Sequence, residues 1–179
     1  VQVTGHAAAD GTTGSGIYVD GDLTISGPGA LNATGTEVPS SGLSAANGIY
    51  ATGDITISGG TINATGNGSG ENIPSSRGII SYGGGVTITG GTVNAVGGEA
   101  TFLGGSYGIA VGSSYSLVIE GGEVTAEGGS GAITKYNSSL VPVVKISPPS
   151  GRHIAVDAGE NAESAAAIDG SPFSYEYDG

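Results

Sequence analysis

The sequence predicts an all-β fold, namely a right-handed, single-stranded parallel β-helix (a solenoid) with three short strands per coil and about five coils. Segments 16–35, 48–66 and 78–97 align almost residue for residue, and 108–128 repeats the pattern with drift. Each segment holds three short β-type runs separated by Gly-rich turns. The runs have a period of two and are rich in β-branched residues, which disfavours a helical solenoid.

The alignment places like residues in columns, one above another in successive coils. Alternate residues of a strand share a face, so these columns predict the interior. The apolar columns are Ile17, Ile49, Ile79 and Ile109 in the first strand; Leu23, Ile55, Val86 and Leu117, and Ile25, Ile57, Ile88 and Ile119, in the second; and Leu31, Ile62, Val93 and Val124, and Ala33, Ala64, Ala95 and Ala126, in the third. The alanine column predicts a corner where two walls approach closely.

The chain divides into a solenoid, 1–156, and a C-terminal cap or linker tail, 157–179, which includes a candidate short helix. Within the solenoid, coils are expected near 1–5, 16–35, 48–66, 78–97 and 108–128, with a degenerate one over 131–156. Val1 and Val3 match the third strand of an earlier coil. Val144 and Ile146, and then Ile154 and Val156, can supply two strands of a fifth coil. Because the chain starts inside a strand-like segment, we expect further domains of a larger chain.

The amino-acid composition restricts which kinds of molecule the chain could bind. The 179 residues include 37 Gly and 7 Pro, which the repeat explains as turn residues. With 16 acidic and 4 basic residues the net charge is −12, which disfavours nucleic acid. There is no cysteine, so disulfides and thiolate metal sites are excluded. No run is long and apolar enough to predict membrane insertion.

A group of tyrosines is the first candidate binding surface. Tyr18 and Tyr50 share an outward column in adjacent coils, and Tyr82 lies close, shifted by one extra residue. Aromatic rings about 4.8 Å apart could receive the C–H face of a sugar, or could only stabilise the strands. The long connectors after each third strand, with Glu37 and Glu71, are a second candidate surface, since insertions gather on one face of a solenoid.

Stacked carboxylates form a candidate metal site. Asp22 and Asp54 share a column before the second strand, and Asp20 adds a third carboxylate. Carboxylates this close repel unless a cation or backbone N–H groups offset the charge. The pattern therefore fits either a calcium site or turn capping by aspartate.

Asparagines form a further column, Asn32, Asn63 and Asn94, continued by Thr125. Amide side chains in such a column can hydrogen-bond from coil to coil and hold the register. We interpret these residues as structural.

The positions of the basic residues along the chain disfavour a catalytic function. Lyases of pectate-lyase-like fold need a basic residue beside acidic calcium ligands, and hydrolases need two converging carboxylates. The only basic residues other than histidine are scattered over loops and the irregular end of the chain; they are Arg77, Lys135, Lys145 and Arg152. The sequence therefore predicts no enzyme.

The repeat, clearest at 48–66, resembles a bacterial family of extracellular parallel β-helices, the carbohydrate-binding domain-containing proteins of clostridia and gut Firmicutes. The resemblance covers 16–128 and implies a non-catalytic, calcium-dependent polysaccharide binder at the cell surface. The family often has Asp before the Gly-Ile of the first strand. In this chain that place holds Ser15, Asn47, Arg77 and Tyr107.

Together these features predict a secreted or cell-surface module that binds a polysaccharide or cell-wall glycan, with calcium as an assisting ion. The first alternative is a structural stalk or adhesin segment of a larger surface protein. The second is a carbohydrate-active enzyme of pectate-lyase-like fold, which the scattered basic residues disfavour.

Overall fold

Three parallel sheets, one for each strand of the repeat, form the walls of the molecule in the computed structural model. The structure describes residues 1–4, 14–36, 45–68, 75–99, 105–135, 143–146 and 174–177. These residues form strands and turns but no helix. None of them therefore lies in a helix long and apolar enough to cross a membrane.

Sheet A contains the third strands of the repeat. Its order is β1 (Gln2–Thr4), β4 (Ala30–Thr34), β7 (Thr61–Thr65), β10 (Thr92–Val96) and β13 (Glu123–Glu127). Gln2 pairs with Asn32, which confirms that the first residues supply the third strand of an earlier coil. The asparagine column is confirmed as hydrogen-bonded. Asn63 Nδ2 donates to Asn32 Oδ1 at 2.7 Å, and Asn94 Nδ2 donates to Asn63 Oδ1 at 2.8 Å.

Sheet B contains the first strands. Its order is β2 (Ile17–Val19), β5 (Ala45–Ala51), β8 (Ser75–Ser81), β11 (Ser106–Val111) and β14 (Gly131–Lys135). The predicted isoleucine column pairs as expected and continues into β14 at Ile133. The strand β14, which the sequence showed only as part of a degenerate coil, therefore opens a fifth coil.

Sheet C contains the second strands. Its order is β3 (Leu23–Ile25), β6 (Ile55–Ile57), β9 (Val86–Ile88), β12 (Leu117–Ile119), β15 (Val143–Ile146) and β16 (Ser174–Tyr177). Leu117 pairs with Val144 and Ile119 with Ile146, so the predicted strand at these residues is confirmed and belongs to sheet C. The other strand predicted for the fifth coil, at Ile154 and Val156, lies outside the described residues. The strand β16 pairs in parallel with β15. The candidate helix of the tail lies outside the described residues.

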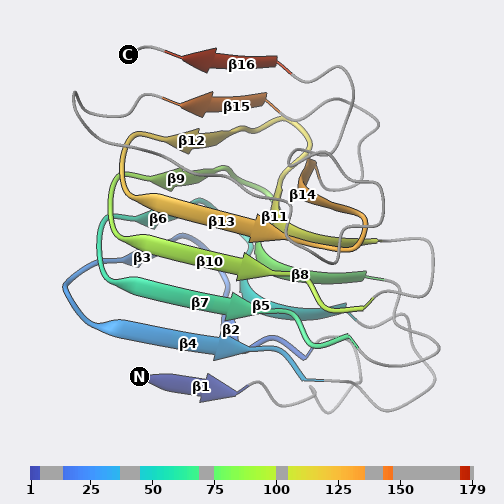
Figure 1. Cartoon of the computed structure of the whole chain (residues 1–179). Coiled ribbons are helices and arrows are strands. Elements are labelled where there is room, and N and C mark those ends of the chain that lie inside the picture. Colours follow the sequence, from blue (N-terminus) through green and yellow to red (C-terminus); the bar gives the residue numbers. More distant parts are fainter. Residues whose placement is uncertain are drawn as a thin grey trace.

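The strands wind in one continuous right-handed path. Figure 1 shows β4, β7, β10 and β13 running from left to right in front of β3, β6, β9 and β12, which run back from right to left, while the coils rise toward the C-terminal strands. That path has the hand found for nearly all parallel crossovers. The predicted fold class, a parallel β-helix with three strands per coil, is confirmed.

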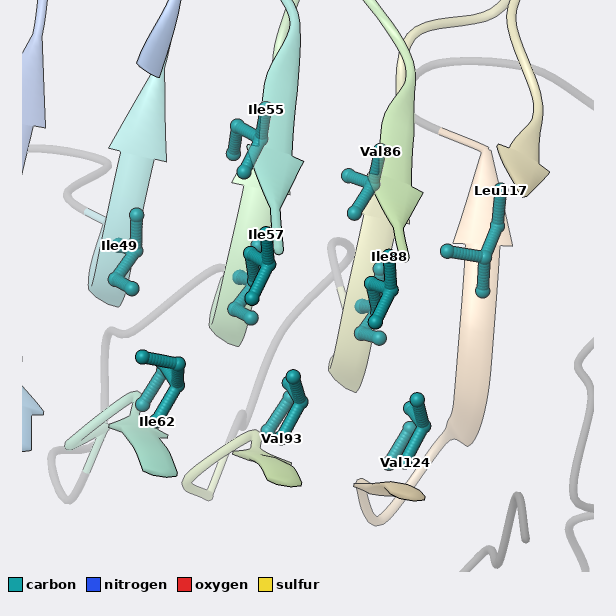
Figure 2. Close-up of a cluster of buried hydrophobic side chains, with 14 of the residues drawn as sticks. Ile49, Ile55, Ile57, Ile62, Val86, Ile88, Val93, Leu117 and Val124 are labelled. Carbon is teal, nitrogen blue, oxygen red and sulfur yellow. The ribbon is translucent and has the colours of Figure 1, made fainter. Parts of the chain in front are cut away.

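Stacked apolar columns fill the interior. Figure 2 shows Ile55, Val86 and Leu117 in one stack and Ile62, Val93 and Val124 in another, on facing walls. Every one of these side chains is fully buried or 1% exposed. A solenoid interior of this kind removes apolar area from water along its whole length, and burial of each such side chain contributes about 1.5–3 kcal/mol.

The alanine column marks the corner where sheets A and B meet. A Cβ placed on Gly48 would lie 2.6 Å from Thr65 N and 2.8 Å from Ala64 C, and Gly78 and Gly108 stand in the same relation to the next two coils. The backbones approach so closely that the Cβ of any other residue would clash at Gly48, Gly78 and Gly108. The close corner predicted from the alanines is therefore confirmed.

Candidate functional site

Two tyrosines of sheet B stack on each other. Tyr18 in β2 pairs in register with Tyr50 in β5, and their ring centroids lie 5.2 Å apart with planes only 7° from parallel. Aromatic pairs prefer an offset stack with this centroid separation. Tyr18 is 57% exposed, whereas Tyr50 is half-buried.

Tyr82 extends this pair into the third coil from a different position in the chain. It lies in the turn after β8, and its ring centroid is 6.1 Å from that of Tyr50 with a 33° tilt. The residue in register with Tyr50 is Ile80, which is 1% exposed. The predicted proximity of Tyr82 is confirmed, and we call Tyr18, Tyr50 and Tyr82 the tyrosine cluster.

The part of sheet B beside the cluster is buried on both faces. All seven residues of β8 are buried, and Ile80 and Ala110 are buried although neither belongs to the central apolar core. Arg77, also buried, donates from Nη1 to Ser75 Oγ at 2.8 Å. The outer face of sheet B is therefore covered at Ile80 and Ala110, beside the tyrosine cluster.

The aspartates tie successive turns together. Asp22 Oδ1 accepts a hydrogen bond from Asp54 N at 2.9 Å, and Asp54 Oδ1 accepts one from Gly85 N at 2.8 Å. Asp20 Oδ1 accepts a hydrogen bond from Thr52 Oγ1 at 3.0 Å. Each carboxylate thus uses one oxygen to cap a turn of the next coil, which is the structural role that the sequence analysis weighed against calcium.

The described residues hold no group of three or more His, Asp or Glu side chains that could ligate a metal ion. Asp20, Asp22 and Asp54 retain a second carboxylate oxygen each, so calcium at these turns stays a prediction. Glu37 and Glu71, the candidates in the connectors, lie outside the described residues.

One exposed aromatic residue was not singled out by the sequence analysis. Tyr115 lies in the turn between β11 and β12 and is 45% exposed. The available signal was that each of four consecutive coils carries a tyrosine between the start of its first strand and its second strand, and that the fourth coil carries two, Tyr107 and Tyr115. That signal is weak because the spacing from tyrosine to second strand differs between coils.

Comparison of the whole sequence with family models, with curated proteins and with solved structures gives no match.

Proposed function

We propose that this chain is a non-catalytic module that binds polysaccharide through the tyrosine cluster. The observation that carries the proposal is the stack of Tyr18 on Tyr50, continued by Tyr82, on the outside of the solenoid. Tyrosine combines an apolar ring, which packs against the C–H face of a sugar, with a hydroxyl that can hydrogen-bond to the sugar. The ring also has few rotatable bonds, so little conformational entropy is lost when a ligand binds.

The charge of the chain favours a neutral glycan. The net charge of −12 gives a negative potential around the molecule, which repels polyanions such as pectate. Asp20 and Asp22, both exposed, lie in the turn that follows the strand of Tyr18. Carboxylates accept hydrogen bonds from sugar hydroxyls, so these side chains complement a neutral ligand at the edge of the cluster.

Calcium and location are secondary parts of the proposal. Calcium would raise affinity for an acidic glycan by offsetting the repulsion between ligand and protein, and the second oxygens of Asp20, Asp22 and Asp54 are the groups available for it. A position outside the bacterial cell, at the cell surface or secreted, follows from the resemblance of the repeat to extracellular carbohydrate-binding solenoids.

The test is retention on insoluble polysaccharide. The chain is mixed with cellulose, chitin, β-1,3-glucan, starch and peptidoglycan, in calcium and in EDTA, and the bound fraction is measured. We expect at least one neutral polymer to retain it in EDTA. A Tyr18→Ala, Tyr50→Ala double variant should lose retention and keep its β-rich circular dichroism spectrum.

The matched control changes two exposed hydroxyl residues of the other sheets, Thr24→Ala and Thr61→Ala, and should bind as the parent does. Full retention by the tyrosine variant would contradict the role of the cluster. If the parent binds no polymer in either buffer, the stalk or adhesin segment becomes the better proposal, since three continuous sheets through successive coils suit a rigid spacer.

A further inference from the structure

The stacked pair of tyrosines offers one open ring face, that of Tyr18. Tyr50 lies between the rings of Tyr18 and Tyr82, whose centroids are 5.2 and 6.1 Å from its own. Tyr18 stacks on Tyr50 with one face and belongs to β2, the edge strand of sheet B among the described strands. The 57% exposure of Tyr18 therefore includes the ring face turned away from coil 2. A ligand ring can stack there as the next member of the column.

A carboxylate is held beside this ring. Asp20 follows Tyr18 by two residues, so it lies on the same side of the chain, about 6.6 Å further along. The backbone ladder continues to this point, because Thr52 N donates to Val19 O at 3.0 Å. Asp20 Oδ1 accepts a hydrogen bond from Thr52 Oγ1 at 3.0 Å, and Thr52 Oγ1 accepts one from Gly21 N at 2.7 Å. These bonds position one carboxylate oxygen and leave the other for a ligand, at a residue that is exposed.

The charge of the surrounding residues favours a cation at this place. Segments 14–36 and 45–68, which contain coils 1 and 2, hold Asp20, Asp22 and Asp54 but no Lys or Arg. The negative potential that repels a polyanion attracts a positive charge. The face of a tyrosine also attracts a cation, through the quadrupole of its ring. The ring and the carboxylate therefore favour the same kind of ligand, an apolar ring with a positive charge at its edge.

Resting on the proposed function, we propose that Tyr18 and Asp20 form a subsite for one amino sugar with a free, protonated amine, such as a glucosamine unit of a glycan. The C–H face of the sugar packs on the open face of Tyr18, and the ammonium group donates a charge-assisted hydrogen bond to the second oxygen of Asp20. A neutral sugar uses the same ring but makes only an uncharged hydrogen bond to the carboxylate. The subsite therefore binds an amino sugar more tightly than its N-acetylated counterpart.

The experiment compares two β-1,4-linked trimers, one of glucosamine and one of N-acetylglucosamine, by isothermal titration calorimetry. At low salt, and below the pKa of the ligand's amine, the glucosamine trimer should bind about 3- to 30-fold more tightly, which is the gain expected from an exposed ion pair together with a cation–π contact. High salt should reduce this ratio because it screens exposed charges.

Four variants separate the subsite from the rest of the surface. Asp20→Asn keeps an oxygen for Thr52 Oγ1 but removes the charge, so it should bring the ratio of the two affinities close to one. The matched control is Glu123→Gln, which makes the same change in net charge at an exposed residue of sheet A and should keep the ratio of the parent. Tyr18→Ala should lose both trimers, whereas Tyr18→Phe, which keeps the ring, should bind both.

Equal affinities for the two trimers, or binding of neither, would overturn the inference. An equal fall of the ratio in Asp20→Asn and Glu123→Gln would also overturn it, because it would indicate a general attraction to the negative surface. Any of these results leaves the proposed function standing if an insoluble neutral polymer still retains the chain through Tyr18 and Tyr50. If neither trimer binds and no insoluble polymer retains the chain, both proposals fall together.

Discussion

Coil 1 (residues 16–35) and coil 2 (residues 48–66) have nearly the same sequence but lie in different environments. In coil 2 the apolar residues are fully buried or nearly so, as at Ile49, Ile57 and Ile62. Their counterparts in coil 1, Ile17, Ile25 and Leu31, are only partly buried. The strands β2 and β3 of coil 1 lie at the edges of sheets B and C among the described strands, whereas β5 and β6 of coil 2 have neighbours on both sides.

This comparison shows that position in the stack, as well as sequence, sets how much a residue contributes. A coil covers its apolar residues with the coil on either side of it, so stability is nearly a sum of neighbour contacts. Identical substitutions in coils 1 and 2 should therefore have unequal effects, and the difference measures the contribution of the neighbouring coil.

The largest difference is expected for a buried charge. Ile57→Asp places a carboxylate among apolar side chains without a partner, at a cost of several kcal/mol, comparable to a typical total stability of about 5–15 kcal/mol. We expect this variant not to fold, so that its thermal melt shows no cooperative transition. Ile25→Asp, whose side chain reaches water, should stay folded with a lower melting temperature. Thermal melts followed by circular dichroism decide this, and equal losses in the two variants would contradict the neighbour argument.

Since Ile57→Asp is expected not to fold, alanine at the same two positions gives a milder form of the same comparison. Ile57→Ala should cost about 2–5 kcal/mol, and Ile25→Ala less because the site is partly open. Urea denaturation measures both.

The asparagine column gives an intermediate effect. Asn63 both donates and accepts a hydrogen bond in the column, whereas Asn32 takes part as the acceptor from Asn63. Asn63→Ala should cost about 1–3 kcal/mol because it leaves an amide donor and an amide acceptor unmatched. Asn32→Ala should cost roughly half as much. Urea denaturation of the two single variants tests this order, and a larger loss for Asn32→Ala would show that the column does not carry the register.

The smallest effect is expected at the aspartate turns. Asp54→Ala removes the acceptor for Gly85 N and should cost about 0.5–1 kcal/mol, because water can replace a partner at an exposed site. Asp54→Asn keeps an oxygen at that place and removes the repulsion from Asp22, so its stability should equal or slightly exceed that of the parent. Melting temperatures at low salt distinguish the two variants. A large loss in Asp54→Asn would indicate that the negative charge itself is required.

Much of the fold could be predicted from the sequence because the columns repeat. A period of two within strands and a fixed spacing between coils determine which residues pair, and the Ile49–Ile79 register follows directly. The strand β14 was harder to see because Ala132 takes the place of the Gly in the Gly-Ile signature, although Ile133 keeps the column.

The candidate site was less predictable because it depends on turn length. Tyr18 and Tyr50 align by register alone and were predicted as a stacked pair. The positions of Tyr82 and Tyr115 depend on extra residues in the turns, which shift a side chain relative to the strands of the neighbouring coil. A period in the sequence carries no information about how an inserted residue redirects the chain.

The spacing of hydrogen-bonded partners has a consequence for how the chain folds. Asn63 and Asn32 are 31 residues apart, as are Asn94 and Asn63, and Asp54 and Asp22 are 32 apart. Closing a flexible segment of this length costs about 3 kcal/mol in chain entropy by the logarithmic law. The cost is the same for every coil, because the distance along the chain is set by coil length and not by the number of coils. The solenoid can therefore grow by whole coils while the mean separation of contacts, relative to chain length, falls.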